Sequence, residues 1–290
     1  MAATLDLERT AGASGTGAPH IVDTLIAERA PRLSSSWAWP LVRPPLLALL
    51  GYRRAREMAD HIACGGGAQA MDYASERLKL RLTIHGQERI PASGRVIVVV
   101  NHPTGLADGV AVDDVLKPAR PDRIYFANAD ARRVSPRLDE IFIPVEWVEA
   151  KRTRQSIRLT LTRAQAALEA ERALVIFPSG RISRRRKGVL ADLPWAASAL
   201  SLARRRHAPV LPIHLAGPPS RLFRLFDHVS SELRDVTLFH ELLNKQGGAF
   251  RVTIGPLIPP EAIAEPAETT ARLKAYVEEV LPLHPDQPFA

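Results

Sequence analysis

One stretch of the sequence decides both the fold class and the candidate chemistry: Val98-Val99-Val100-Asn101-His102-Pro103-Thr104-Gly105-Leu106-Ala107-Asp108-Gly109. Its three consecutive valines predict a strand that is buried on both faces. The strand runs directly into a polar loop that holds His102, Asp108 and two glycines. Loops at the ends of buried strands are where α/β folds place binding and catalytic residues. The stretch therefore predicts an α/β fold with a site at the carboxyl end of this strand.

Short apolar runs of the same kind recur along residues 78–290, which we expect to form the main domain. Alternating or continuous apolar residues predict strands. The predicted strands cover residues 80–85, 95–100, 123–127, 141–147, 173–178, 209–215 and 250–255.

Residues at helical spacing lie between these strands. Ile157, Leu161, Ala164 and Leu168 fall on one face of a helix. Further helices are predicted over residues 196–206 and about 269–281. Strands that alternate with helices favour an α/β domain, with a mixed central sheet flanked by helices.

The first 77 residues differ in character from the rest. Residues 1–19 are rich in Ala, Gly, Thr and Ser and predict a disordered tail, with no apolar signal-peptide core. Residues 20–77 predict an interrupted helical segment. Within it, residues 37–52 mix Trp, Leu and Pro and are followed at once by arginines. This composition suits an interfacial helix on a membrane, and equally a helix that packs on the main domain. The run is too short and interrupted to span a bilayer.

The charge of the chain favours an anionic partner. The formal net charge is +8 and the isoelectric point is about 10.1. Nucleic acid, an acidic carrier protein and an anionic membrane would each fit. Aromatic residues make up only 6% of the chain and no familiar nucleic-acid module is visible, so we expect no nucleic-acid partner. The single cysteine, Cys64, excludes an internal disulfide framework and is expected to be a small buried residue. The histidines show no metal-ligand spacing, and no metal is expected.

His102 and Asp108 are the residue types that general-base chemistry needs. A neutral imidazole can take a proton from a hydroxyl, and a carboxylate on its other nitrogen fixes the tautomer. No side-chain nucleophile accompanies the pair, which suits activation of a hydroxyl or amine on a second substrate. The alternative is structural: Asp108 caps the next helix and His102 is merely hydrogen-bonded. A serine hydrolase is disfavoured because the chain has no Gly-x-Ser-x-Gly pentapeptide.

Two later segments narrow the choice. Residues 173–183 form a predicted strand that ends in a Pro-Ser-Gly turn before a basic run, and residues 208–214 form a strand bracketed by prolines. In this order and at these intervals, the three segments resemble the lysophospholipid and glycerolipid acyltransferases. That family carries an Asn-His-x4-Asp loop, then Phe-Pro-Glu-Gly-Thr-Arg, then a Val-Pro-hydrophobic-Pro-Val strand. The resemblance covers about residues 78–218.

The resemblance implies an O-acyltransferase of lipid metabolism. Such an enzyme moves a fatty acyl group from an acyl-CoA or acyl carrier protein thioester to the hydroxyl of a lysolipid, with no other cofactor. His102 would be the general base and Asp108 its orienting partner. An anionic membrane would be a further partner, with the protein peripheral on the cytoplasmic face of the inner membrane. The residues expected to bind the acceptor or the acyl group are Asn101, Thr104, Gly105, Phe177, Pro178, Ser179, Gly180, Arg181 and Pro212.

The sequence departs from the family in its two best-known motifs. The gap between His102 and Asp108 is one residue longer than the family norm, so either the loop bulges or Asp108 is not the true partner. In the second motif, Ser179 stands where the family has Glu, Arg181 at the Thr position and Ile182 at the Arg position.

A third departure concerns the family's intermediate motif, which helps to hold glycerol phosphate. It would fall near residues 142–145, where no arginine stands; Lys151, Arg152 and Arg154 come several residues later. The usual acceptor, lysophosphatidate, is therefore in doubt. A lyso-aminolipid, such as a lyso-ornithine lipid, fits the altered positions better. The alternative is a catalytically inactive relative that only binds lipid.

Overall fold

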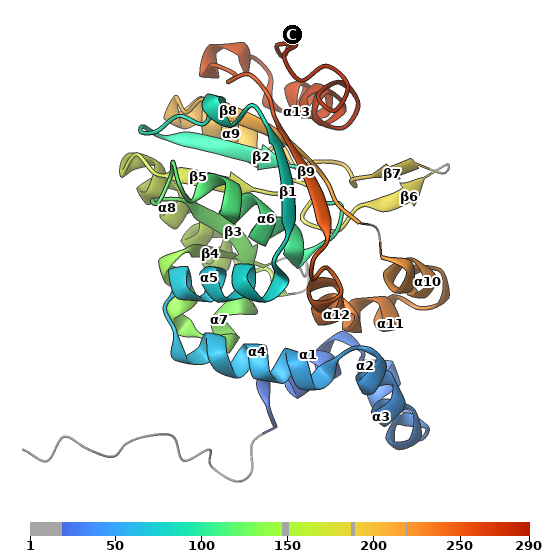
Figure 1. Ribbon diagram of the computed structural model, residues 1–290. Helices are drawn as coiled ribbons and strands as arrows, with labels where there is room; N and C mark the ends of the chain where they lie inside the picture. The colour runs from blue at the N-terminus through green and yellow to red at the C-terminus, as the bar shows by residue number, and fades with distance from the viewer. Residues whose placement is uncertain (1–18, 147–150, 187–188, 219) are drawn as a thin grey trace, which may run out of the picture.

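A computed structural model describes residues 19–146, 151–186, 189–218 and 220–290 (Figure 1). The predicted tail therefore lies almost wholly outside the described residues. The main sheet has seven strands in the order β1-β9-β8-β2-β5-β3-β4. Only β8 and β9 pair antiparallel, so the sheet is mixed as predicted. Its strands are β1 (Arg81–His85), β2 (Val96–Val100), β3 (Ile124–Asn128), β4 (Phe142–Val145), β5 (Ala173–Ile176), β8 (Val210–Ala216) and β9 (Ala249–Ile254).

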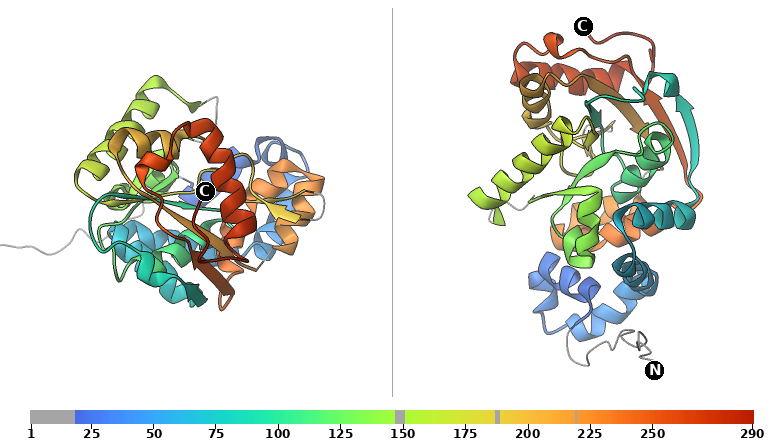
Figure 2. Two further views of the ribbon diagram at one scale, coloured as in Figure 1. Left: turned by 90° about the horizontal axis from the view of Figure 1, so that it is seen from above. Right: turned by 90° about the vertical axis from the view of Figure 1, so that its left-hand side faces the viewer.

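Helices cover both faces of this sheet, as the two views in Figure 2 show. Successive residues of a strand point to opposite faces of the sheet, and β2 therefore contributes residues to two separate hydrophobic cores. Val98 and Val100 pack with one face, covered by α5 (Gly67–Leu78) and α6 (Leu106–Leu116). Ile97 and Val99 pack with the other. That second face is covered by α8 (Arg154–Glu169), α9 (Ser198–Arg206) and α13 (Pro266–Ala275), which continues as a π-helical turn over Tyr276–Val280.

Only half of the predicted apolar face of α8 is buried. Ala164 and Leu168 are fully buried, whereas Ile157 is 49% exposed and Leu161 45% exposed. The reason is the position of the helix: its second half packs on the sheet, and its first half extends outward beyond the edge strand β4 (Figure 2, right). Helical periodicity identified the helix and its face, but it could not tell where the sheet beneath it ends.

A third core joins the N-terminal helices to an insertion between β8 and β9. The N-terminal helices are α1 (Ile21–Arg29), α2 (Pro31–Ser34), α3 (Trp39–Leu49) and α4 (Tyr52–Cys64). The insertion holds α10 (Arg221–Val229), α11 (Ser231–Val236) and α12 (Leu238–Leu243), none of which the sequence predicted. Val22, Leu46, Leu50 and Val236 are buried together in this core. Cys64 at the end of α4 is exposed, so the expectation that it is buried was wrong.

Of the two interpretations of residues 37–52, packing on the protein is confirmed in part, and the membrane-interfacial one stays a prediction. Leu46, Leu47 and Leu50 are buried in the third core, so α3 does pack on the protein. Trp37 is nevertheless 88% exposed and Leu41 74% exposed. No helix within the described residues is long and apolar enough to cross a bilayer.

The remaining elements are short. The basic run after the Pro-Ser-Gly turn is not a simple solvated stretch, because β6 (Arg184–Arg186) pairs antiparallel with β7 (Val189–Ala191). This hairpin stands out from the body beside α10 (Figure 1). The other short helices are α7 (Ala131–Val134) and the 3-10 turns Gln87–Arg89, Pro136–Glu140 and Pro260–Ala262.

Candidate active site

The topology brings all three decisive segments together, because β2 lies between β5 and β8 and is parallel to both. Strand β2 is parallel to β5, with Val99 opposite Ile176, so their carboxyl ends meet. His102 follows β2 and Phe177 follows β5 directly. The two rings lie with centroids 4.6 Å apart and planes tilted by 34°. His102 keeps 18% of its side chain exposed, which leaves it open to a substrate.

Asp108 contacts His102 despite the longer gap between them. The distance from His102 Nδ1 to Asp108 Oδ2 is 2.9 Å. Just before α6, at the end of this loop, Gly105 has φ of +96°. Only glycine adopts such a conformation readily, and a Cβ there would lie 2.8 Å from Ile182 Cδ1. The two alternatives for the longer gap were a loop that bulges and a partner other than Asp108. The contact between His102 and Asp108 favours the first.

The Asp108 carboxylate is fully buried and accepts several hydrogen bonds. Besides His102, Oδ2 accepts from the backbone N–H of Thr104 at 2.8 Å and of Gly105 at 3.0 Å, and Oδ1 accepts from the Thr104 hydroxyl. Backbone N–H groups can only donate, so Oδ2 is an acceptor and the His102 Nδ1 must carry the proton. The lone pair is then on Nε2. Asp108 thus caps α6 and orients His102 at once, and the two interpretations of this residue are not exclusive.

Asn101 and Pro212 lie within the sheet. The Asn101 amide donates to the Leu215 carbonyl at 2.9 Å and accepts from the Leu215 N–H at 2.6 Å. This side chain extends the pairing of β2 with β8 by one step. Pro212 is buried in β8 opposite Val99. Asn101 and Pro212 thus belong to the pairing of β2 with β8 beside the His102 loop. Neither of them forms a hydrogen bond with His102.

The Pro-Ser-Gly turn follows the His102 ring partner Phe177. The N–H of Gly180 donates to the Phe177 carbonyl at 2.9 Å, and Gly180 has φ of +61°. The Ser179 hydroxyl donates to the Arg181 carbonyl, and the Arg181 side chain is exposed. Pro178 is buried, and its carbonyl accepts from Ala196 N–H. The expected binding roles of these turn residues stay predictions.

Sequence reasoning missed Asp192, which lies just after β7 and binds the main chain of His102. The His102 N–H donates to both carboxylate oxygens of Asp192, at 3.1 and 3.2 Å. No spacing pattern links residues 90 positions apart. It also missed Glu241 of α12, which is buried in an ion pair with Lys245 at 3.2 Å and lies beside Gly105.

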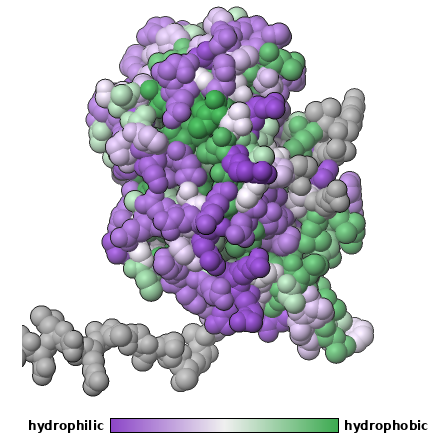
Figure 3. Space-filling model, in the orientation of Figure 1, coloured by the Kyte–Doolittle hydropathy of each residue, from purple (hydrophilic) through white to green (hydrophobic). Residues whose placement is uncertain are grey.

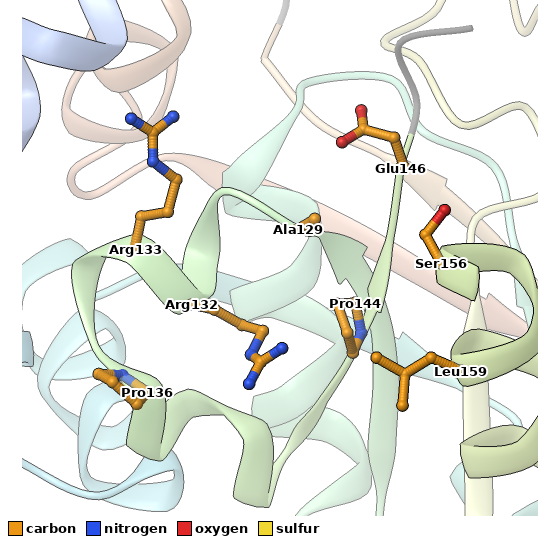
Figure 4. Close-up of a pocket in the computed structure, with 8 residues that line it drawn as sticks. All are labelled: Ala129, Arg132, Arg133, Pro136, Pro144, Glu146, Ser156 and Leu159. Carbon is orange, nitrogen blue, oxygen red and sulfur yellow. The ribbon is translucent and has the colours of Figure 1, made fainter. Parts of the chain in front are cut away.

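A cavity of about 370 Å³ lies at the ends of β3 and β4, where the family's intermediate motif would fall. Its lining includes Arg132 from α7, whose guanidinium points toward Pro144 in Figure 4. Arg132 is a third residue that sequence reasoning missed. It is paired with Asp139 at 3.0 Å, and Asp139 also pairs with Arg163 at 3.2 Å, so one carboxylate is shared by two guanidinium groups. His102 and Asp108 do not line this cavity.

The chain is similar to several known proteins. The family model described as Acyltransferase matches residues 81–216. The lyso-glycine lipid O-acyltransferase of Phocaeicola vulgatus is 25% identical over 221 residues, which cover 74% of this chain and 77% of the relative. The protein of the same name from Bacteroides thetaiotaomicron is 24% identical, over 74% of this chain and 79% of its own. The crystal structure of the 1-acyl-sn-glycerophosphate acyltransferase PlsC from Thermotoga maritima superposes with a TM-score of 0.48 at 17% identity, over 89% of this chain and 93% of that one.

The matched region 81–216 holds strands β1 to β8 and the His102–Asp108 pair, and its match defines the class of this region as an acyltransferase domain. The chain is similar to the lysophospholipid and glycerolipid acyltransferases, and both relatives are named O-acyltransferases.

Proposed function

We propose that the protein transfers a fatty acyl group from an acyl-CoA or acyl carrier protein thioester to the hydroxyl of a lyso-aminolipid. His102 Nε2 takes the proton of the acceptor hydroxyl while the hydroxyl oxygen attacks the thioester carbonyl carbon. The C–S bond then breaks, and the leaving thiolate takes the proton back from the imidazolium. The products are an ester and a free thiol. Asp108 stabilises the imidazolium that forms between these steps.

The observation that carries this proposal is the contact from His102 Nδ1 to Asp108 Oδ2. It leaves Nε2 as an unprotonated base in a partly exposed loop. The hydroxyls nearest to the pair are already engaged: Thr104 Oγ1 donates to Asp108, and Ser183 Oγ donates to Asp192. The nucleophile is therefore best supplied by the second substrate, as acyl transfer to a lysolipid requires.

The choice of a lyso-aminolipid rests on two supports. Ile182 stands where the family has an arginine that can bind phosphate, and an apolar side chain cannot replace a charge-assisted contact. Arg132 reaches the other expected position but is already paired with Asp139. In addition, the two curated relatives are named for an aminolipid acceptor, a lyso-glycine lipid. A lyso-glycine or lyso-ornithine lipid has the free hydroxyl that the chemistry needs and no phosphomonoester.

We further propose peripheral binding to an anionic membrane, on the cytoplasmic face of the inner membrane. Hydrophobic side chains gather at the lower right of Figure 3, where Figure 1 shows α3 and α10. Trp37 and Leu41 are the most exposed apolar residues at this end, and Leu49 is 57% exposed. Apolar side chains beside cations are typical of a surface that sits at headgroup level.

A groove of about 760 Å³ between α3, α4 and α12 adjoins these residues. Leu47, Leu50 and Leu243 contribute its apolar lining, and Arg53 and Arg54 its charge. Neither arginine forms an ion pair with another described residue. Unpaired cations beside apolar lining favour an anionic lipid as the partner of this end of the molecule.

A thioester-release assay tests the proposed function. The purified chain is given one acyl-CoA or acyl carrier protein donor, with and without a lyso-aminolipid. Thiol release that depends on the acceptor, with formation of the diacylated lipid, is the expected result. Lipid binding without thiol release from either donor would instead identify the chain as a catalytically inactive lipid-binding relative.

A further inference from the structure

Both main-chain polar groups of His102 are held by one distant segment. The His102 N–H donates to the Asp192 carboxylate, and the His102 carbonyl accepts from the Ser183 N–H at 2.8 Å. Strand β2 has already ended at Val100, so sheet pairing does not fix this residue. The segment on either side of the β6–β7 hairpin therefore replaces the sheet as the support for the His102 backbone.

Asp192 is built into this position from several sides. It is only 3% exposed, and its carboxylate accepts from the Ser183 hydroxyl and, at 2.8 Å, from Trp195 Nε1. A buried carboxylate is stable only when such donors compensate for lost hydration. Ser183 and Asp192 are also bonded to each other, so the two contacts with His102 act as one unit.

A second carboxyl group fixes the backbone of Asp192. The Asp192 N–H donates to Glu278 Oε1 at 2.6 Å, and Glu278 also accepts from Lys274. Burial raises the pKa of the Glu278 carboxyl above its usual value, while its bond to Lys274 works in the opposite direction. The support of His102 thus reaches back to the last helix of the chain.

We infer that Asp192 is a positioning residue for the proposed base, and that Asp192 and Ser183 together form a clamp on the His102 peptide. This inference rests on the proposed role of His102. The His102 imidazole must keep its contact with Asp108 while Nε2 faces the acceptor, and both depend on the backbone angles of His102. A misplacement of about 1 Å in a catalytic group can cost about 10²-fold in rate.

The test compares three variants of the full chain. Asp192→Asn keeps the shape but removes the charge and one acceptor oxygen. Ser183→Ala removes one donor to Asp192 and keeps the backbone bond to His102. Trp195→Phe removes the other side-chain donor to Asp192 and, like Ser183→Ala, keeps both hydrogen bonds to the His102 backbone.

Two quantities are measured for each variant, kcat and KM for acyl transfer, and the downfield proton resonance of His102 Nδ1–H. That resonance is assigned by its absence in His102→Ala. We expect Asp192→Asn to lower kcat by about 10²-fold with KM changed by less than about threefold, and to move or broaden the resonance. Ser183→Ala and Trp195→Phe each remove one donor to Asp192 and no bond to His102, so both should lie between Asp192→Asn and wild type.

The outcomes separate this inference from the proposed function. If Asp192→Asn and Trp195→Phe lose thermal stability alike while kcat and the resonance stay unchanged, Asp192 is only a structural residue and the inference is overturned. If Asp192→Asn does not fold, Ser183→Ala decides by the same two measurements. If the wild-type chain transfers no acyl group but the resonance still responds to Asp192→Asn, the clamp stands and the proposed activity is wrong.

Discussion

Replacing Asp108 with asparagine isolates the charge of the proposed pair. Oδ2 receives three donors, while Oδ1 contacts only the Thr104 hydroxyl. An asparagine amide can place its oxygen at the Oδ2 position and donate its NH₂ to Thr104 Oγ1, because a hydroxyl both donates and accepts. Every hydrogen bond then keeps a partner. We therefore expect Asp108→Asn to fold normally and to keep the His102 tautomer.

The expected loss of rate comes from the imidazolium, which the neutral amide stabilises less. The difference between a hydrogen bond with a charged partner and a neutral one is about 1 kcal/mol, or about fivefold in rate. Two unit charges about 4 Å apart attract by about 4 kcal/mol at an effective dielectric constant of about 20, an upper limit of about 10³-fold. His102 is partly exposed, which places the expected fall in kcat between these limits, at about 10²-fold.

The assay is thiol release from the acyl donor at saturating lyso-aminolipid, with circular dichroism to confirm the fold. Thr104→Val is the matched control: it removes the hydroxyl contact to Oδ1 and keeps the contact from His102 to Oδ2. The charge that stabilises the imidazolium is retained, so the fall in kcat should stay below about fivefold, or about 1 kcal/mol. If Asp108→Asn kept more than about a third of wild-type turnover, the reasoning would be refuted, because even the smaller expected loss, about fivefold, leaves less activity than that.

Three further predictions address the base, the acceptor and the membrane. His102→Ala should lower turnover by about 10²–10⁴-fold with the fold intact, and a variant that keeps more than about a tenth would contradict the assignment. In a competition at equal concentration with one acyl thioester, a lyso-aminolipid should be acylated in preference to lysophosphatidate; an advantage of about tenfold for lysophosphatidate would mean that Arg132 or the basic residues 151–154 bind the phosphate. Flotation with vesicles that contain anionic phospholipid should show binding that weakens in high salt and in the double variant Arg53→Glu, Arg54→Glu, whereas binding that survives both would point to another surface. Point variants are preferred to truncation, because α1, α3 and α4 belong to the third core.

The sheet could be predicted from sequence because burial on both faces imposes continuous apolar runs. All seven strands of the main sheet lie where the apolar runs predict them, within a few residues at each end. The insertion α10–α12 was missed for a physical reason. That reason holds for α11 and α12, which have six residues each, too few for a helical period to be distinctive. In α10, by contrast, Leu222, Leu225, Phe226 and Val229 do recur at helical spacing, and this signal was missed. All three helices are stabilised by packing on α1, α3 and α4, a contact between segments far apart in the chain.

The residues of the candidate site also fall into those that could be predicted from the sequence and those that could not. His102 and Asp108 could be found because their residue types are chemically specific and lie in one loop after a buried strand. Asp192 could not, because it binds a backbone N–H of His102, and that group is the same in almost every residue. Arg132 was missed because it comes from α7, whereas the resemblance directs attention to residues 142–145.

The geometry around Gly105 gives a structural reason for the altered second motif. Ile182, at the family's arginine position, lies against Gly105, where even a Cβ would meet its Cδ1 at 2.8 Å. The next residue, Ser183, binds the His102 carbonyl and Asp192. In this chain the segment therefore turns its side chains toward the His102 loop. An arginine at position 182 would have to break the contact with Gly105 or turn its side chain away from the His102 loop. The reason is that a guanidinium needs hydrogen-bond partners, which an apolar contact does not offer. Gly105 and Ile182 are thus two parts of one arrangement, in which the glycine leaves the space that Ile182 fills against the backbone of the His102 loop.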